Sequence, residues 1–158
     1  MKRHWGFFSV LPLLLAACGA AQEQTPTALE PAKDTKATFC GMTLAEHPGP
    51  KGQIHVAGET VAWFSSVKDA FSYMKNEGAT RRILAFYVND MDRADWQHPQ
   101  PGTWIAAKGA YFLLDSSKTS GMDVSEIIPF GNREAAQKWR ESYGGRVLTY
   151  GEVLREAM

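Results

Sequence analysis

The residues best suited to chemistry are Cys40 and Met42, two positions apart in the run Phe39-Cys40-Gly41-Met42. A thiolate and a thioether are soft ligands, and among biological metals soft ligands select Cu(I). If this run is extended, side chains two residues apart point to the same face. The pair therefore predicts a Cu(I) site. A cysteine packed as a small hydrophobe and a methionine that fills the core would produce the same pattern.

The start of the chain bears on whether Cys40 is a free thiol. Lys2 and Arg3 precede an apolar run too short to span a bilayer, and small residues lead to Cys18, which is the order of an export signal. This arrangement looks like a bacterial lipoprotein site, at which residues 1–17 are removed and Cys18 is acylated. Cys18 then cannot pair with Cys40. Because an unpaired structural thiol is vulnerable in an oxidising compartment, export favours a functional role for Cys40.

The predicted lipoprotein signal also indicates where in the cell the protein is located. Acyl chains on Cys18 would anchor it in a membrane on the periplasmic side, and Gly19 after the cysteine slightly favours the outer membrane. Residues 18–37 are rich in Gln, Thr, Pro, Ala and Glu, which predicts a flexible tether. Residues 38–158 are enough for one domain of ordinary size or for two very small, fused units. Without the two basic signal residues the chain is close to neutral, which argues against nucleic acid as a partner.

Further copper ligands can be sought among the other methionines and the histidines. Met122 lies in the polar, glycine-containing stretch 118–123, where a methionine has little to pack against, so we expect it to be the third soft ligand. Imidazole also binds copper, but spacing does not choose among His47, His55 and His98. The sequence contains no C-x-x-C pair, clustered zinc ligands, phosphate loop or G-x-S-x-G elbow, which argues against the corresponding chemistries.

The elements that would position these residues follow the order strand, strand, helix, strand in each half. Alternation, helical spacing and turn signals predict these elements at 53–56, 61–64, 67–77 and 83–88, and again at 110–114, 127–130, 133–143 and 146–150. A last short helix is expected at 152–157. An offset of 66 residues aligns Phe64 with Phe130 and Gly78 with Gly144, although two amphipathic helices can match by chance. The predicted fold is α+β.

An ordered set of sequence blocks resembles the NosL family, the accessory lipoproteins of nitrous oxide reductase. The resemblance runs from about Thr38 to Tyr150, and the lipoprotein signal agrees with it. The matching blocks are Phe39 to Met42, Ala45 to Ile54, Trp63-Phe64, Tyr87 to Asp90, Trp104-Ile105 with Ala107, Gly121-Met122 and Ile128 to Phe130. The family's fold implies two fused ββαβ units with small mixed sheets, here about residues 38–102 and 103–158.

NosL proteins are periplasmic copper chaperones, so the resemblance implies a Cu(I) carrier that is not an enzyme. It also implies delivery of copper for the catalytic copper–sulfide centre of nitrous oxide reductase, with the apo-enzyme and its ABC-type membrane maturation complex as partners. The family's Cys-x-Met motif falls on Cys40 and Met42, and its later Gly-Met position falls on Met122. Many members have a second cysteine three positions before the motif. Here that residue is Ala37, so a site that needs two cysteines is excluded.

Two other functions stay open from the sequence. Cys40 could be the nucleophile of a thiol-dependent lyase, with Asp69 or His55 as acid or base. Alternatively, the chain could be a non-metal interaction module of a membrane assembly complex, anchored on aromatic side chains, namely Trp63, Trp96 and Trp104. The loop from Met91 to Trp104 would then either form the docking face or pack against the core.

Overall fold

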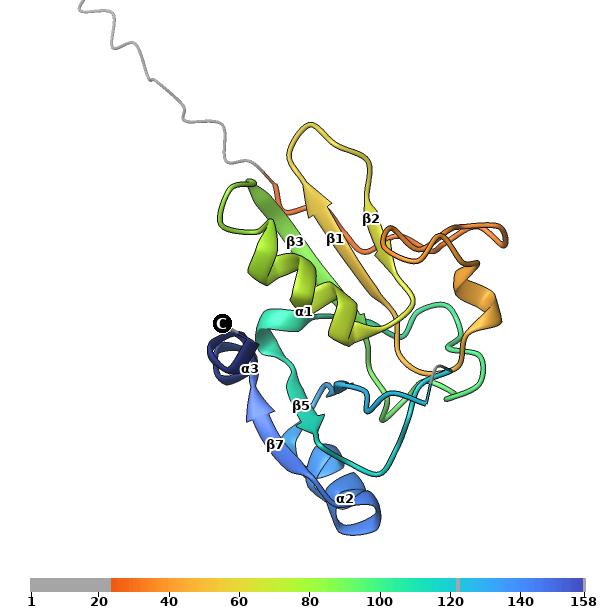
Figure 1. Ribbon diagram of the computed structural model, residues 1–158, viewed down its shortest axis with the longest axis vertical. Coiled ribbons are helices and arrows are strands. Elements are labelled where there is room, and N and C mark those ends of the chain that lie inside the picture. Colours follow the sequence, from red (N-terminus) through yellow and green to blue (C-terminus); the bar gives the residue numbers. More distant parts are fainter. Residues whose placement is uncertain (1–23, 122, 158) are drawn as a thin grey trace, which may run out of the picture.

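Two small β-sheets and three α-helices make up the described part of the chain (Figure 1), which in this computed structural model comprises residues 24–121 and 123–157. The strand orders are β2-β1-β3-β4 and β6-β5-β7. No helix within these residues has the length and hydrophobicity needed to cross a membrane. In chain order the elements are η1 (Leu44–Glu46), β1 (Gly52–Val56), β2 (Ala62–Phe64), α1 (Val67–Asn76), β3 (Ile83–Asn89), β4 (Trp104–Ala106), η2 (Ala107–Gly109), β5 (Tyr111–Leu114), β6 (Ile128–Phe130), α2 (Arg133–Tyr143), β7 (Arg146–Thr149) and α3 (Tyr150–Ala157).

The predicted α+β fold with two ββαβ units is confirmed. In each unit the first strand lies between the other two, and each helix begins after a capping side chain, Ser66 in α1 and Asn132 in α2. All strand pairs are antiparallel, so the expectation of mixed sheets is wrong. The reason is the path of the chain: the helix returns it to the end where the second strand began. The third strand therefore runs antiparallel to the central first strand.

Strand β4 was not expected from the sequence. It pairs with the end of β3, with Trp104 opposite Asn89 and Ala106 opposite Tyr87. Three residues are too few to display an alternating pattern, so only the tertiary pairing reveals the strand. Because β4 extends the first sheet, the expected division near residues 102 and 103 separates this strand from the sheet to which it belongs.

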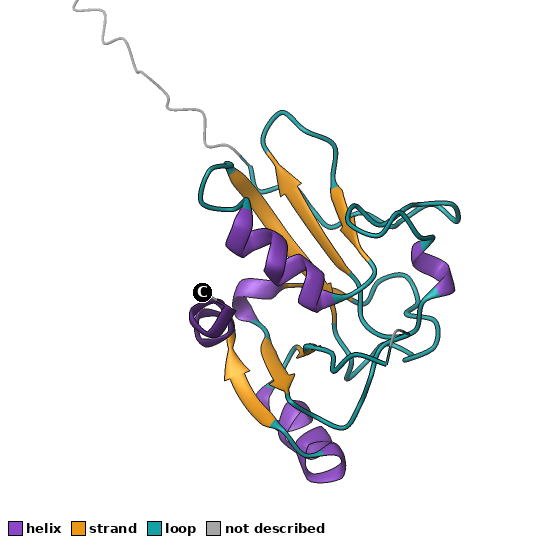
Figure 2. Cartoon of the chain, in the orientation of Figure 1, coloured by secondary structure: helices purple, strands orange, loops and turns teal. Residues whose placement is uncertain are grey.

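The two halves share one hydrophobic core, centred on Phe71 of α1. Its ring lies 5.4 Å from that of Phe86 in β3, 5.2 Å from Phe112 in β5 and 5.7 Å from Tyr150 in α3, measured between centroids. Figures 1 and 2 show α1 in front of the first sheet and α3 beside the second. A second cluster, which includes Phe130, lies under α2. Because Phe71 joins both sheets, the halves form one structural unit.

An N-terminal strap, residues 26–33, lies across the face of the first sheet opposite α1. The buried carboxamide of Gln53 in β1 accepts a hydrogen bond from Leu29 N (2.8 Å) and donates one to Leu29 O (2.9 Å). The Tyr87 hydroxyl donates to Pro26 O at 2.8 Å. The Glu30 carboxylate accepts a hydrogen bond from Trp104 Nε1 at 3.1 Å and another from Gly102 N at 2.9 Å, in the loop between β3 and β4. Much of the stretch expected to be a flexible tether, residues 18–37, is therefore bound to the domain.

We expect Gln53→Ala to release the strap. The substitution removes both hydrogen bonds to Leu29 and also the 2.9 Å contact between Gln53 Oε1 and His55 Nε2. Losing buried hydrogen-bond partners should cost about 2–3 kcal/mol of unfolding free energy. Hydrogen exchange at the Leu29 amide, measured by NMR, should become much faster, whereas the exposed control Gln97→Ala should leave it unchanged. Equal protection of Leu29 in both variants would contradict this role of Gln53.

Candidate metal centre

Cys40 lies in a tight turn between the strap and η1. Ala37 N donates to Met42 O at 2.9 Å, and Gly41 N donates to Ala37 O at 2.9 Å. Gly41 has φ +69°, a left-handed conformation that glycine adopts readily. The run is therefore a turn and not an extended strand, so the argument that Cys40 and Met42 share one face of a strand does not apply. The turn still keeps the two residues close because it is closed between Ala37 and Met42.

The turn is held against the start of α1 and presents its thiol to solvent. The Phe39 ring packs edge-on against Phe64 at the end of β2, with centroids 5.5 Å apart. Cys40 is exposed, and its Sγ lies 3.5 Å from Ser65 Oγ. Met42 is half-buried. An exposed cysteine beside a methionine has little packing role, so the reading of Cys40 as a small core hydrophobe is not supported.

Two of the predicted ligand and anchor positions lie outside the described residues: Met122, and Cys18 within residues 1–23. The neighbour of Met122 in the chain, Gly121, is described. A Cβ atom added to Gly121 would lie 2.9 Å from Pro48 Cδ and 3.1 Å from His47 Nδ1. The Gly121 backbone thus packs directly on the His47-Pro48 segment, and only a residue without a side chain allows this approach.

The three histidines have different surroundings. His47 follows η1 at a short distance along the chain from Cys40, is half-buried and contacts Gly121. His55 is buried under the strap, where Nε2 contacts Gln53 Oε1 at 2.9 Å and burial lowers the pKa of the ring. His98 is exposed in the loop between β3 and β4. Of the three, His47 alone lies against the residue that precedes Met122 in the chain.

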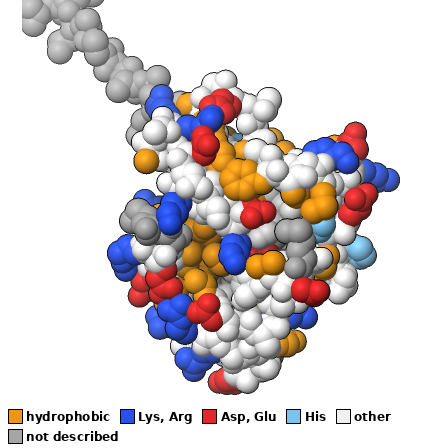
Figure 3. All heavy atoms as spheres, in the orientation of Figure 1, with side chains coloured by type: hydrophobic (Ala, Val, Ile, Leu, Met, Phe, Trp, Pro, Cys, Tyr) orange, Lys and Arg blue, Asp and Glu red, His pale blue; other side chains and the backbone are white. Residues whose placement is uncertain are grey.

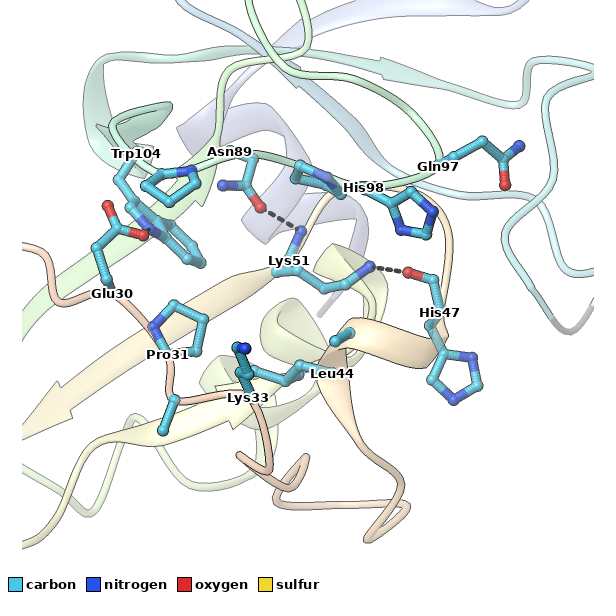
Figure 4. A pocket seen from close by; sticks show the side chains of 14 residues that line it. Glu30, Pro31, Lys33, Leu44, His47, Lys51, Asn89, Gln97, His98 and Trp104 are labelled. Carbon is cyan, nitrogen blue, oxygen red and sulfur yellow. Dashed lines mark hydrogen bonds between the residues drawn. The ribbon is translucent and has the colours of Figure 1, made fainter.

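Lys51 fixes the backbone that carries His47. Its Nζ donates to His47 O at 2.7 Å, to Gly49 O at 2.6 Å and to Pro48 O at 3.4 Å. Burial lowers the pKa of Lys51 to about 8, against the opposing effect of the negative charge of Glu126. In Figure 4 the Lys51 ammonium reaches the His47 carbonyl while the His47 imidazole points away from it. The imidazole is therefore not engaged by this lysine.

Glu126 is a buried carboxylate near the same region. It is 1% exposed, and its Oε1 accepts hydrogen bonds from Ser66 Oγ (3.1 Å), Lys68 N (3.1 Å) and Ile127 N (2.8 Å). Burial raises its pKa to about 7, although these hydrogen bonds and the positive charge of Lys51 act in the opposite direction. Sequence reasoning missed Glu126 and Lys51 because their burial depends on contacts between distant segments.

A cavity of about 230 Å³ lies between the strap and the loop from β3 to β4 (Figure 4). Neither Cys40 nor Met42 lines it, so the cavity is separate from the turn that carries them. Two polar groups on its wall, the Lys51 ammonium and the Glu30 carboxylate, are hydrogen-bonded within the fold. Its residues include Glu30, Lys33, His47, Lys51, His98 and Trp104.

The ligand chemistry of the described residues limits the kind of metal that can bind. No group of three or more His, Cys, Asp or Glu side chains there is arranged to hold a metal ion. Met42 lies in the same closed turn as Cys40, and a thiolate together with a thioether suits Cu(I).

The observed contacts weaken the two other functions considered from the sequence. The hydrogen-bond partner of the Cys40 thiol is the Ser65 hydroxyl, whereas His55, a candidate base, is held by Gln53 under the strap. The tryptophans proposed as docking anchors are half-buried and pack within the fold: Trp63 on Trp104 at 6.0 Å, and Trp96 on Trp139 at 6.0 Å. Met91, at the start of the loop between β3 and β4, is in the core.

The surface charges are mixed in sign. Basic and acidic side chains are interspersed over the face of the molecule in Figure 3.

Comparisons with known proteins agree with this geometry. The family model described as NosL matches residues 28–158. The chain is 38% identical over 145 residues to the copper-binding lipoprotein NosL of Achromobacter cycloclastes, which covers 89% of this chain and 74% of that protein. It is 30% identical over 155 residues to the copper-binding lipoprotein NosL of Stutzerimonas stutzeri, which covers 94% of this chain and 80% of that protein.

Solved structures show the same relationship. The crystal structure of the copper chaperone NosL from Shewanella denitrificans matches with a TM-score of 0.75 at 30% identity, over 80% of this chain and 94% of that one. The solution structure of apo-NosL from Achromobacter cycloclastes matches with a TM-score of 0.50 at 36% identity, over 64% and 82% of the respective chains. These relatives are described as copper-binding lipoproteins and a copper chaperone, not as enzymes. With the family model matching nearly all of the described residues, the chain belongs to the NosL family.

Proposed function

We propose that this protein is a Cu(I) chaperone, anchored by acylated Cys18 on the periplasmic side of a bacterial membrane, with the outer membrane slightly favoured. The observation that carries the proposal is the exposed Cys40 thiol, held in a closed turn with Met42. The names of its relatives support copper as the cargo and a lipid anchor. The soft donor set supports the Cu(I) oxidation state, because thiolate and thioether ligands favour it.

The proposed ligands are Cys40, Met42 and Met122. A small set of sulfur ligands at an exposed turn suits a carrier, because a partner can add a ligand to Cu(I) before the carrier loses its last one. Transfer can then proceed by stepwise ligand substitution without release of the free ion. A deeply buried site would slow this exchange, since the partner could not reach the metal.

We expect His47 to strengthen Cu(I) binding, because it contacts Gly121 next to the proposed ligand Met122. Replacing His47 with Ala should weaken Cu(I) affinity about tenfold, which corresponds to roughly 1.4 kcal/mol. His98→Ala is the matched control, since this exposed histidine also precedes a proline. Its affinity should equal that of the wild type. A competition titration with a Cu(I) chelator at fixed pH compares the variants, and equal affinities in both would remove His47 from the site.

The cargo is proposed to reach the apo form of nitrous oxide reductase, for assembly of its catalytic copper–sulfide centre, through the ABC-type membrane maturation complex. Because Pro26 is bound to Tyr87, only about eight Cα–Cα steps separate the proposed anchor Cys18 from the domain, and these can span at most about 28 Å. The domain would then stay close to the bilayer, and its effective concentration near a membrane complex would be high.

Copper transfer tests this proposal directly. Full-length protein purified in detergent and loaded with Cu(I) is mixed anaerobically with the maturation complex and the apo-enzyme, and copper in each component is measured after separation. We expect copper to move from the loaded protein faster than from a small-molecule Cu(I) complex at equal free Cu(I). Equal rates from the two donors would show that the protein does not deliver copper to this target.

A further inference from the structure

We propose that Glu126 is a positioning residue, which fixes the loop that carries Met122 against the Cys40 side of the molecule. This inference rests on the proposed function, because it takes Met122 and Cys40 as ligands of the same Cu(I) ion. The relevant loop joins β5 to β6, and within it the described residues on either side of Met122, 119–121 and 123–125, form a short hairpin. Met122 is the middle residue of this hairpin in the sequence.

Glu126 stands at the base of the hairpin. The hairpin is closed by an antiparallel bridge between Thr119 and Ser125, and Ser120 N donates to Val124 O at 3.0 Å. Glu126 follows Ser125 directly and bonds to Ile127 N, the residue before β6. A contact at this position therefore sets the direction in which the whole hairpin leaves the second sheet.

The carboxylate of Glu126 connects this base to the first half of the protein. Its Oε1 accepts from Ser66 Oγ and from Lys68 N, both at 3.1 Å and at the start of α1. The positive end of the helix dipole favours a carboxylate there. The residue before Ser66 is Ser65, whose hydroxyl lies 3.5 Å from Cys40 Sγ. One buried side chain thus joins the base of the Met122 hairpin to the helix start that contacts the cysteine.

The opposite side of the hairpin has a matching restraint. Gly121 packs on His47 and Pro48, and Lys51 Nζ donates to the carbonyl groups of both residues. Lys51 and Glu126 carry opposite charges and are both buried. Lys51 therefore holds the segment on which Gly121 packs, whereas Glu126 connects the base of the hairpin to the start of α1.

The environment of Glu126 is poorly explained by stability alone. Its Oε2 is buried and has no hydrogen-bond donor among the described residues, and burial raises the pKa of the carboxyl group to about 7. Burial therefore disfavours the ionised form, and the hydrogen bonds to Oε1 offset only part of that cost. A buried charge that contributes little to stability can instead specify one arrangement of the segments it joins.

A double-mutant cycle with Met122 tests this role. Wild type, Glu126→Gln, Met122→Leu and the double variant are prepared as full-length protein in detergent. Cu(I) affinity is measured by chelator competition, and X-ray absorption counts the sulfur neighbours of bound copper. We expect Glu126→Gln and Met122→Leu each to weaken affinity about tenfold and to remove one sulfur neighbour. The double variant should be no worse than either single variant, because both changes remove the same contact.

Asp90→Asn is the matched control. Asp90 is also a buried carboxylate that accepts backbone hydrogen bonds, from Asp92 N at 3.1 Å and Gly131 N at 2.9 Å, but it does not bond to the hairpin or α1. It should keep the wild-type affinity and sulfur count. If Glu126→Gln does not fold, Ser66→Ala removes one donor while keeping the charge, and its affinity should fall by a smaller factor.

The outcomes separate this inference from the proposed function. Wild-type affinity and sulfur count in Glu126→Gln, or in Ser66→Ala where Glu126→Gln does not fold, would overturn the positioning role and leave the chaperone function intact. Losses in affinity that multiply in the double variant would also overturn it, because Glu126 would then act independently of Met122. If wild-type protein binds Cu(I) weakly, or equally well without Cys40, the chaperone function fails and this inference fails with it.

Discussion

The Cys40→Ser variant is expected to lose tight Cu(I) binding while keeping the wild-type fold. Serine replaces the one thiolate of the proposed site with a hard hydroxyl, and the remaining ligands are thioethers, which carry no charge to offset that of Cu(I). We expect the affinity to fall at least a hundredfold, or roughly 2.7 kcal/mol. Because Cys40 is exposed, the substitution leaves no cavity in the core, and thermal unfolding should be nearly unchanged.

The measurement is an anaerobic Cu(I) titration of full-length protein against a competing chelator. Ser65→Ala is the matched control, because it removes the hydroxyl that contacts Cys40 Sγ but leaves all proposed ligands in place. It should keep binding close to that of the wild type. Tight binding that persists in Cys40→Ser would mean that copper binds elsewhere or that the family's cargo does not apply to this chain.

The Phe71→Ala variant is expected to lose most of the stability of the protein. Phe71 is 1% exposed and contacts rings from both sheets and from α3. Truncating a buried phenylalanine typically costs about 3–5 kcal/mol, compared with a total stability of about 5–15 kcal/mol for most domains. Since Phe71 joins the two halves, we expect both to unfold together at a lower urea concentration.

Urea unfolding followed by tryptophan fluorescence and circular dichroism measures this effect. Phe39→Ala is the control, because Phe39 is 48% exposed and its ring packs at the edge of the same core. It should cost far less, about 1 kcal/mol. A small effect of Phe71→Ala, or two separate unfolding transitions, would show that the halves are independent units and not one cooperative domain.

Local patterns in the sequence were sufficient to predict most of the elements. Strands such as β1 and β3 and the helices α1 and α2 have clear hydrophobic periods and capping residues, and these signals depend only on near neighbours in the chain. The two capping residues in the structure, Ser66 and Asn132, are also related by the 66-residue offset. The soft chemistry of Cys40 and Met42 is likewise a property of residue types. The sequence could therefore predict the fold class, and its residue types favour copper as the expected cargo.

Only the tertiary structure decided how these parts are connected. The strap looks like a tether in composition, but Gln53 supplies hydrogen bonds that bind it to the sheet. Glu126 looks like an ordinary surface carboxylate, yet its partners lie about 60 residues away at the start of α1. His47 could not be distinguished from the other histidines until Gly121 was seen to pack against it. Contacts between distant segments leave no periodic pattern in the sequence, because each depends on the geometry of the whole fold.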